Sequence, residues 1–457
     1  MDTRKKEGTA LWRFSQKFQF AAEKIIPDPL VFCLILTVII YVCGLIFTKS
    51  NAIELLTFWY DGFWSQIAFA FQMSFMVITC AVTARSNVVQ KLLNNLSKAV
   101  KTPTAAIIFL LVFGYVTSFF NWAFCTIVTP IFAMFLAKRI KGLHFPMLVA
   151  AGYATMILGQ CLAPTASLYA LLASPDHFLV DKMGVLTQDV TVYNRMNIVL
   201  FLILAVATIL ITIATQPPKD SIIEFHSALD DVEPVDTNDE DEEGKSFANA
   251  MNGSKLLMYF IGIAGIVIII NTLITKGFMK SLSLNFIIFF FMTLNCIIYN
   301  SPKKFITAYR NNMHLATDVM IQFPFYGGIS GIMTQSGLGQ IIVGGFVSFA
   351  TAHTLPVFTY LSASIINLFI PSQGGQWIVQ GDIMVDAALQ VKANMPYVVN
   401  AFVLGDEATN LLQPLYVIPA LSVVGMKLKD VWGFMAFIWL ICFIITTIGL
   451  YVLPLIV

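Results

Sequence analysis

Apolar runs of about 20 residues recur along this chain, and they restrict its fold more than any other feature of the sequence. A helix of about 20 apolar residues crosses the hydrocarbon core of a bilayer. Runs of this kind lie at 29–48, 66–85, 145–173, 193–215, 255–275, 283–300, 316–335, 397–425 and 432–456. Of the 457 residues, 58% are hydrophobic and only 12% are charged, which is unlike the composition of a soluble domain. The sequence therefore predicts an all-α polytopic membrane protein with about nine transmembrane helices.

Two further apolar regions, 104–137 and 354–390, are too long for one ordinary span and are interrupted near the middle. The first interruption is Asn121, and the second is the stretch 371–376, with the sequence PSQGGQ. Each half is then short for a full crossing, so two re-entrant hairpins fit these lengths better. Two full but short crossings are the alternative. Glycine permits the turn at such a tip, and freed N–H groups at the start of a half-helix can face an anion.

The basic residues predict the orientation, because Lys and Arg near the ends of spans gather on the cytoplasmic side. With the N-terminus inside and both hairpins re-entrant, the outside receives few of the 27 basic residues, namely Lys49, Lys182, Arg195, Lys276, Lys280 and Lys392. We therefore expect a protein of the cytoplasmic (inner) membrane with its N-terminus in the cytoplasm and its C-terminus outside. The first apolar run follows a basic segment without a small-residue cleavage site, so we expect no removable signal peptide.

Four parts are expected along the chain. They are a cytoplasmic N-terminal segment (1–28), a first membrane repeat (29–216), an acidic cytoplasmic linker (217–254) and a second membrane repeat with one extra leading helix (255–457). The linker is rich in Asp and Glu and poor in aromatic residues, which is typical of a solvated tether. A regulatory or partner-binding role for it is the alternative. The seven cysteines lie in apolar runs without metal-ligand spacing, so neither a disulfide framework nor a metal site is indicated.

The two membrane parts resemble each other in sequence. Segment 71–90 aligns with 321–340, segment 118–124 with 364–370, and segment 159–173 with 405–420. The features follow the same order in both parts, whereas the span at 255–275 has no counterpart, so the second copy is expected to be inverted. Inverted repeats with discontinuous helices are typical of secondary transporters, whose sites form near the bilayer midplane.

Polar residues at the hairpin tips and in the broken spans are the candidate site. The tips carry Asn121, Trp122, Asn367, Ser372, Gln373, Gly374, Gly375 and Gln376. The broken spans carry Gly159, Gln160, Pro164, Thr165 and Ser167 in the first repeat, and Gly405, Asp406, Glu407, Thr409, Asn410, Gln413 and Pro414 in the second. Small and polar residues also pack membrane helices together, which is the structural alternative for each of them.

Asp406 and Glu407 differ from the other acids because they lie inside a predicted span, where a charge costs at least about 2.5 kcal/mol. That cost favours a functional role. The alternative is that Asp406 caps the second half of the broken helix, since acids at a helix N-terminus are stabilising.

No Lys or Arg falls near a predicted midplane, so a substrate carboxylate would need neutral donors, backbone N–H groups or a co-bound cation. We predict substrate binding by Asn121, Trp122, Thr165, Ser372, Gln373, Gly374 and Gly375. For the coupling ion, Na⁺ or H⁺, we predict Asn121, Asn367, Asp406, Glu407, Thr409 and Asn410. We expect no catalytic residue, no metal beyond Na⁺ and no other cofactor.

With these residues identified, the chain resembles the short-chain fatty acid transporter family, the acetoacetate and butyrate permeases of the larger ion-transporter superfamily. The resemblance runs over nearly the whole chain, and its most specific pieces are NWAF (121–124), PSQGGQW (371–377) and the segment 405–413. It implies uptake of a short-chain monocarboxylate coupled to Na⁺ or H⁺, an elevator-like movement and a homodimer. The family usually has Gly where Gln373 stands, so another organic anion or an amino-acid derivative is the alternative substrate.

Two other classes of protein are disfavoured. A channel needs a continuous polar path, whereas apolar residues flank each hairpin tip. A membrane enzyme is disfavoured because the sequence has no HExxH or GxSxG motif. The expected partners are a small organic anion, the lipid bilayer and a second copy of the chain, and no nucleic acid.

Overall fold

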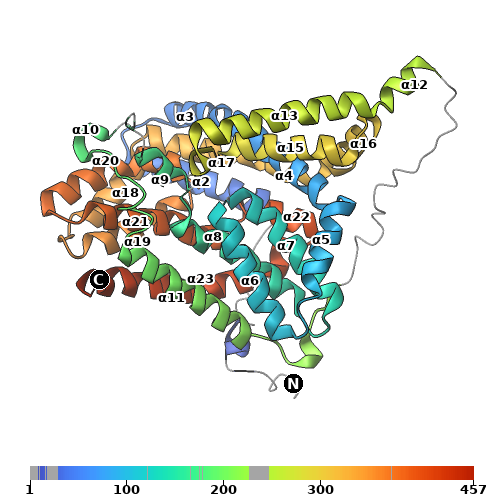
Figure 1. Ribbon diagram of the computed structural model, residues 1–457. Helices are drawn as coiled ribbons and strands as arrows, with labels where there is room; N and C mark the ends of the chain where they lie inside the picture. The colour runs from blue at the N-terminus through green and yellow to red at the C-terminus, as the bar shows by residue number, and fades with distance from the viewer. Residues whose placement is uncertain are drawn as a thin grey trace.

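The computed structural model describes residues 9, 11–15, 17, 29–120, 122–164, 166–173, 175, 177, 179–225, 246–281, 283–371 and 373–456. Throughout these residues the regular structure is helical, without strands (Figure 1). The all-α fold is therefore confirmed. Most of the acidic linker lies outside the described residues.

Between residues 29 and 214, the described part of the chain contains ten α-helices and one 3₁₀ turn. They are α2 (Pro29–Phe47), α3 (Ala52–Ser65), α4 (Ile67–Ala84), α5 (Asn87–Ser97), α6 (Pro103–Phe120), α7 (Trp122–Arg139), α8 (Phe145–Gly159), η2 (Gln160–Leu162), α9 (Ser167–Leu172), α10 (Val180–Met183) and α11 (Arg195–Ala214). The predicted runs 29–48, 66–85, 145–173 and 193–215 all coincide with helices of this set.

The second half of the chain is helical as well. It contains α12 (Phe247–Asn252), α13 (Lys255–Lys276), α14 (Phe278–Ser281), α15 (Leu284–Tyr299), α16 (Pro302–Asn312), η4 (Met313–Ala316), α17 (Thr317–Gln335), α18 (Leu338–Val347), α19 (Leu355–Asn367), α20 (Gln373–Val391), α21 (Met395–Ala408), η5 (Thr409–Leu411), α22 (Ile418–Val424), α23 (Leu428–Val452) and η6 (Leu453–Leu455). A helix pair with a break between its members precedes a broken helix in each half, as α6–α7 before α8 and as α19–α20 before α21.

Local sequence signals explain many helix ends. Asn51 begins α3 with a capping box, in which its side chain accepts from the backbone N–H of Glu54 while the Glu54 carboxylate accepts from the Asn51 N–H. Ser301 caps α16, where Pro302 occupies the first helical position. Gly425 ends α22 in the left-handed conformation, with φ of 68°.

Within the described residues, six helical stretches are long and apolar enough to cross a membrane, judged by length and composition. One of them is α6, whose 18 residues extend over about 27 Å. By length, α6 fits the alternative of a short full crossing for the first half of 104–137, and it ends at Phe120, directly before the predicted interruption at Asn121. The structure also adds α3, a helix of 14 residues that the sequence interpretation did not count among the spans.

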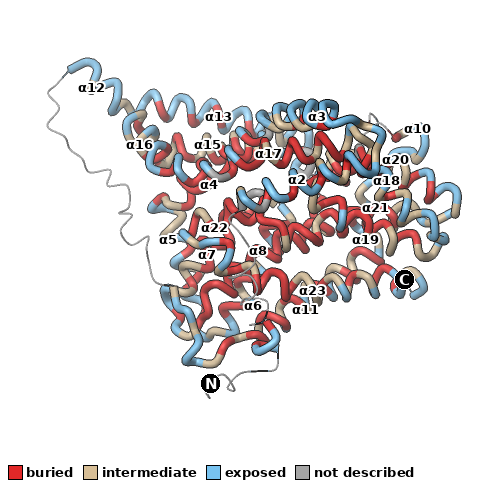
Figure 2. The backbone as a smooth tube through the Cα atoms, turned by 180° about the vertical axis from the view of Figure 1, so that it is seen from behind, coloured by how far each residue is buried: buried red, intermediate tan, exposed pale blue. Residues whose placement is uncertain are grey.

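The helices lie in layers around a buried centre. Figure 1 shows α3, α13, α15 and α17 along one edge of the molecule and α11 and α23 along the opposite edge, with α8 between them. Every residue of α8 is buried, and Figure 2 shows this helix in the interior. By contrast, α13 is mostly exposed along its length (Figure 2), as expected for a helix with one face on the protein and the other in lipid.

Glycines bring α3 and α17 into backbone contact. A Cβ atom added at Gly331 would overlap the backbone oxygen of Phe58, and one added at Gly62 would overlap the backbone oxygen of Gly327. Close approach through small residues is the usual way in which membrane helices associate, because lipid provides no hydrophobic driving force between them. The pair α3–α17 is therefore a tightly packed contact between the two halves of the chain.

Candidate functional site

A cavity of about 90 Å³ lies where the two broken helices meet. The first half contributes Trp122, Met156, Ile157, Gln160 and Ser167 to its lining. The second half contributes Pro371, Gln373, Asp406, Glu407, Asn410 and Tyr416. Residues far apart in the sequence, from both hairpin regions and both broken helices, therefore converge on one space.

The first break follows α8. This helix ends at Gly159, where an added Cβ would lie 2.5 Å from Ser118 Oγ, so a side chain has no room beside α6. The chain then makes a 3₁₀ turn and resumes as a helix at Ser167. The freed carbonyl of Cys161 accepts hydrogen bonds from the Asn197 side chain and from the Tyr169 hydroxyl. These bonds satisfy backbone groups that would be costly to leave unpaired in a membrane.

The second break follows α21 in the same manner. A 3₁₀ turn, Thr409–Leu411, replaces the helix, and the α-helix resumes at Ile418. The carbonyl of Asn410 accepts from the Tyr153 hydroxyl at 3.0 Å, and the carbonyl of Leu412 accepts from Trp432 Nε1 at 2.7 Å. Both breaks are therefore held by side chains from neighbouring helices.

Asp406 and Glu407 occupy the last turn of α21. Asp406 is buried, and its Oδ1 atom has no hydrogen-bond partner among the described residues. Glu407 Oε2 accepts from Asn410 Nδ2 at 3.1 Å. A helix C-terminus carries partial negative charge and favours cations, so two carboxyl groups placed there form a strongly electronegative position. Because the next helix begins only at Ile418, Asp406 does not cap a helix N-terminus, and that alternative is wrong.

A network of hydrogen-bonded amide side chains surrounds Asn410, the partner of Glu407. Asn367 Nδ2 donates to Thr409 Oγ1 at 3.0 Å and to Asn410 Oδ1 at 2.9 Å. Gln413 Nε2 also donates to Asn410 Oδ1, at 2.9 Å. Asn367 and Thr409 do not line the cavity. Asn367 instead bonds to Asn410, which does line it, and Thr409 accepts from the amide of Asn367.

The tip of the second hairpin is fastened to both halves of the chain. Gln373 Oε1 accepts from the backbone N–H of Leu168 at 2.7 Å, which joins the start of α20 to α9. The Tyr416 hydroxyl donates to the carbonyl of Pro371 at 2.6 Å. The Tyr416 ring meets the Trp122 ring edge to face, with centroids 5.6 Å apart. These contacts form one wall of the cavity.

The predicted site residues fall into three groups. Trp122, Gln373, Asp406, Glu407 and Asn410 line the cavity, whereas Asn367, Thr409, Gly374 and Gly375 do not. Asn121, Thr165 and Ser372 lie outside the described residues. Gly374 and Gly375 belong to the first turn of α20 and are not among the glycines with positive φ, so the expectation that they form the turn itself is wrong.

Sequence reasoning missed four lining residues, Met156, Ile157, Pro371 and Tyr416, although Pro371 belongs to the predicted interruption. Met156 and Ile157 precede Gln160 by four and three residues, which places them on the same face of α8. That spacing was the only available signal. Apolar residues that line a cavity cannot be distinguished from other apolar residues of the same helix until the neighbouring helices are known.

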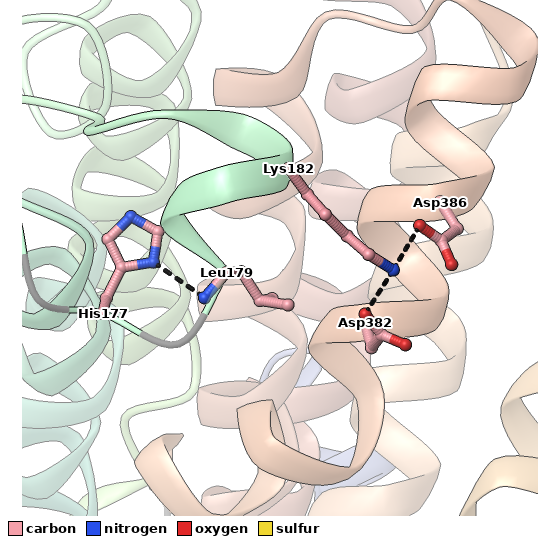
Figure 3. Close-up of polar contacts among 5 residues, drawn as sticks. All are labelled: His177, Leu179, Lys182, Asp382 and Asp386. Carbon is pink, nitrogen blue, oxygen red and sulfur yellow. Dashed lines mark hydrogen bonds and ion pairs between the residues drawn. The ribbon is translucent and has the colours of Figure 1, made fainter.

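Outside the cavity, an ion-pair cluster fastens the segment after α9 to α20 (Figure 3). Lys182 Nζ lies 2.7 Å from Asp382 Oδ1 and 2.7 Å from Asp386 Oδ1. The two aspartates are four residues apart and therefore share one face of α20. The backbone N–H of Leu179 donates to His177 Nδ1 at 3.3 Å, which shapes the segment that carries the lysine (Figure 3).

Replacing Lys182 by methionine is expected to release this segment. Hydrogen bonds to Asp382 and then to Asp386 raise the pKa of Lys182. Because the lysine pKa is higher in the folded than in the unfolded chain, the ion pairs stabilise the folded state fully at pH values below the unfolded-state pKa of about 10.5. This stabilisation is lost as the pH rises through the folded-state pKa. Hydrogen exchange of the amides at 179–186 should therefore be severalfold faster in Lys182→Met at neutral pH. Lys276→Met, at an exposed helix end, is the control, and equal exchange in both variants would contradict the prediction.

The comparisons with known proteins agree with one another. The model of the family described as "Short chain fatty acid transporter" matches residues 10–453. Two relatives named "Putative short-chain fatty acid transporter" come from Escherichia coli (strain K12) and Haemophilus influenzae (strain ATCC 51907 / DSM 11121 / KW20 / Rd). The first is 29% identical over 438 residues, which cover 96% of this chain and 98% of the relative. The second is 29% identical over 449 residues, which cover 96% and 99%.

A solved structure, the crystal structure of the Alcanivorax borkumensis YdaH transporter, is a more distant likeness. It has a TM-score of 0.43 and 14% sequence identity, and the match covers 93% of this chain and 97% of that one.

Proposed function

Because the chain belongs to the short-chain fatty acid transporter family, we propose that it carries a small monocarboxylate of the acetoacetate and butyrate class across the cytoplasmic membrane together with Na⁺ or H⁺. The observation that carries this proposal is the composition of the cavity. Two adjacent carboxyl groups, Asp406 and Glu407, share it with amide and apolar side chains, and no Lys, Arg or His is found among its described lining residues.

The charge of the cavity requires a cation. A substrate carboxylate placed beside Asp406 and Glu407 would be repelled, and the C-terminus of α21 adds to the negative potential. A bound Na⁺ or bound protons would remove this repulsion, and oxygen atoms are the ligands that hard cations prefer. The unpaired Asp406 Oδ1 and the Glu407 carboxylate are the oxygens that we assign to the ion. Asn410, whose Oδ1 already accepts two hydrogen bonds, contributes to the ion position by holding Glu407.

The predicted residues take distinct roles in this proposal. Asn367 positions Asn410 through a direct hydrogen bond, and Thr409 holds the amide of Asn367. Gln373 and Trp122 bind the substrate from the hairpin side, and the N–H groups at the start of α20, including those of Gly374 and Gly375, favour an anion. The assignments of Asn121 to substrate and ion, and of Thr165 and Ser372 to substrate, remain predictions. We assign no catalytic role to the site.

The mechanism that we propose is alternating access by an elevator-like movement in a homodimer. A helical hairpin precedes a broken helix twice, as α6–α7 before α8 and as α19–α20 before α21. This order supports two inverted repeats, at 29–216 and 255–457, joined by the linker at 217–254. A fixed site between two repeats can open to either side when one part moves against the other. In this arrangement the N-terminus is cytoplasmic and the C-terminus is outside.

Transport in proteoliposomes tests the proposal. Uptake of labelled butyrate should be saturable and driven by either a Na⁺ or a pH gradient, and unlabelled short-chain acids should compete with it. The two gradients are imposed separately, so the result also identifies the ion. If folded protein takes up no short-chain acid under either gradient, the substrate is another organic anion or an amino-acid derivative, and the assignment is overturned. Conductance that does not saturate would instead indicate a channel.

Removing the Tyr416 hydroxyl is expected to weaken substrate binding. Tyr416→Phe deletes the 2.6 Å hydrogen bond that holds the Pro371 carbonyl at the hairpin tip. A neutral hydrogen bond contributes about 0.5–1.5 kcal/mol, so the KM for uptake should rise about 3- to 10-fold. Tyr193→Phe, at an exposed tyrosine, is the control. An unchanged KM in Tyr416→Phe would show that the tip does not depend on this bond.

A further inference from the structure

A second, smaller cavity of about 10 Å³ lies directly behind the first. Its lining consists mainly of apolar side chains, among them Tyr360, Trp439, Phe443, Leu158, Leu404 and Leu411. Of the described residues, Ile157 and Glu407 line both cavities. These two side chains therefore form a partition between the first cavity, called the main cavity below, and the second cavity, called the apolar pocket.

The two members of the partition are held differently. The carboxylate of Glu407 is tied to Asn410 by a hydrogen bond of 3.1 Å. Ile157 is 1% exposed, and its side chain has no polar atom, so it can make only apolar contacts. Ile157 is therefore the member of the partition that can be made smaller without removing a hydrogen bond.

The main cavity changes in polarity along α8. Gln160 lies at the broken end of the helix, whereas Met156 and Ile157 lie one turn earlier on the same face. A monocarboxylate matches this gradient when its carboxylate lies toward Gln160 and Gln373 and its alkyl tail lies toward Ile157. The tail then ends at the partition.

We propose that Ile157 sets the upper limit on the length of the acid that this protein transports. The inference rests on the proposed function and adds to it the residue that selects among acids. Truncating Ile157 would join the apolar pocket to the main cavity and give the tail of a longer acid a place to extend. The alternative, that Ile157 is simply part of the packed core, predicts a loss of stability without a change in selectivity.

A series of unbranched acids from butyrate to octanoate tests the proposal as competitors of labelled uptake. In Ile157→Ala, competition by the longer acids relative to butyrate should strengthen about 10-fold, since one methylene in an apolar pocket changes discrimination by at least that factor. Leu158→Ala is the matched control, because Leu158 lines the apolar pocket but not the main cavity. No shift in Ile157→Ala, or an equal shift in both variants, would overturn the proposal. Ile157→Val is a milder variant that should shift preference in the same direction if the alanine variant does not fold.

Two cysteines provide a test that does not depend on transport. Cys161 and Cys442 line the apolar pocket and are buried. In Ile157→Ala, methyl methanethiosulfonate should modify these thiols severalfold faster than in the wild type, as measured by mass spectrometry, whereas Leu158→Ala should behave like the wild type. If the thiols of Ile157→Ala are labelled faster but the wild type transports no acid, the partition is supported and the proposed function is overturned. If labelling in Ile157→Ala is unchanged, the partition is overturned. If labelling is faster but the preference among acids is unchanged, the role of Ile157 in selecting acids is overturned.

Discussion

Replacing Glu407 by glutamine is expected to abolish the accumulation of substrate against its gradient while leaving some exchange of substrate across the membrane. Glutamine keeps the size of the side chain and an oxygen that can accept from Asn410 Nδ2, the present partner of Glu407 Oε2. It removes the charge that we assign to holding the coupling cation. Without a bound cation, the driving gradient no longer contributes free energy, so uptake in proteoliposomes should stop at equal concentrations on both sides.

Glu54→Gln is the matched control for this experiment. Glu54 lies in the first turn of α3, where it forms a capping box with Asn51, and glutamine preserves such a box. This variant should accumulate substrate as the wild type does. Accumulation by Glu407→Gln at the wild-type level would exclude Glu407 from ion coupling and leave Asp406, the other acid that lines the cavity, to be tested.

Replacing Gly331 by alanine is expected to disrupt the contact between α3 and α17. The added Cβ would overlap the backbone oxygen of Phe58 and would lie 2.9 Å from Gly62 Cα. Backbone atoms in two packed helices cannot rotate away as a side chain can, so the helices must separate. Overpacking a well-filled contact costs about 1–3 kcal/mol and occasionally more, and we expect a value at the upper end of this range. A lower melting temperature and a lower yield of monodisperse protein in detergent would show the effect.

Gly344→Ala provides the control, because Gly344 also lies within a helix, α18, but an added Cβ there meets no atom within 4 Å. Alanine has a higher helix propensity than glycine by about 1 kcal/mol. The control should therefore be as stable as the wild type or slightly more stable. Equal melting temperatures for the two variants would mean that the glycine contact does not hold α3 against α17.

Much of the helical framework could be predicted from the sequence. The predicted run 283–300 contains α15, and the predicted interruption at Asn121 falls between α6 and α7. The second interruption comes earlier than predicted, after Asn367 and before Gln373, so that residues 373–376 of the predicted stretch already belong to α20. These features are local. Apolar length predicts a span, and a cluster of Gly, Pro and polar residues predicts where it stops.

The site could be predicted in part. The acids Asp406 and Glu407 were recognisable because a charge inside a span is costly and requires a reason. The separation of roles within the amides was not recognisable. Asn410 lines the cavity, whereas Asn367 lies behind it as a hydrogen-bond donor to Asn410. Both are asparagines at a break, and the sequence has no means to distinguish a lining residue from its support.

Local composition was therefore enough to predict which segments are apolar helices, approximately where these helices are interrupted and which acids lie inside them. Each of these properties depends on the sum of residue contributions over one short stretch. Which helices meet, and which faces they turn to one another, depends instead on tertiary packing. Tyr153 and Asn410, for example, are joined by a hydrogen bond although 257 positions separate them. Such contacts, like the partition at Ile157 and the glycine contact at Gly331, depend on the rotation of each helix about its axis, and packing against other helices sets that rotation.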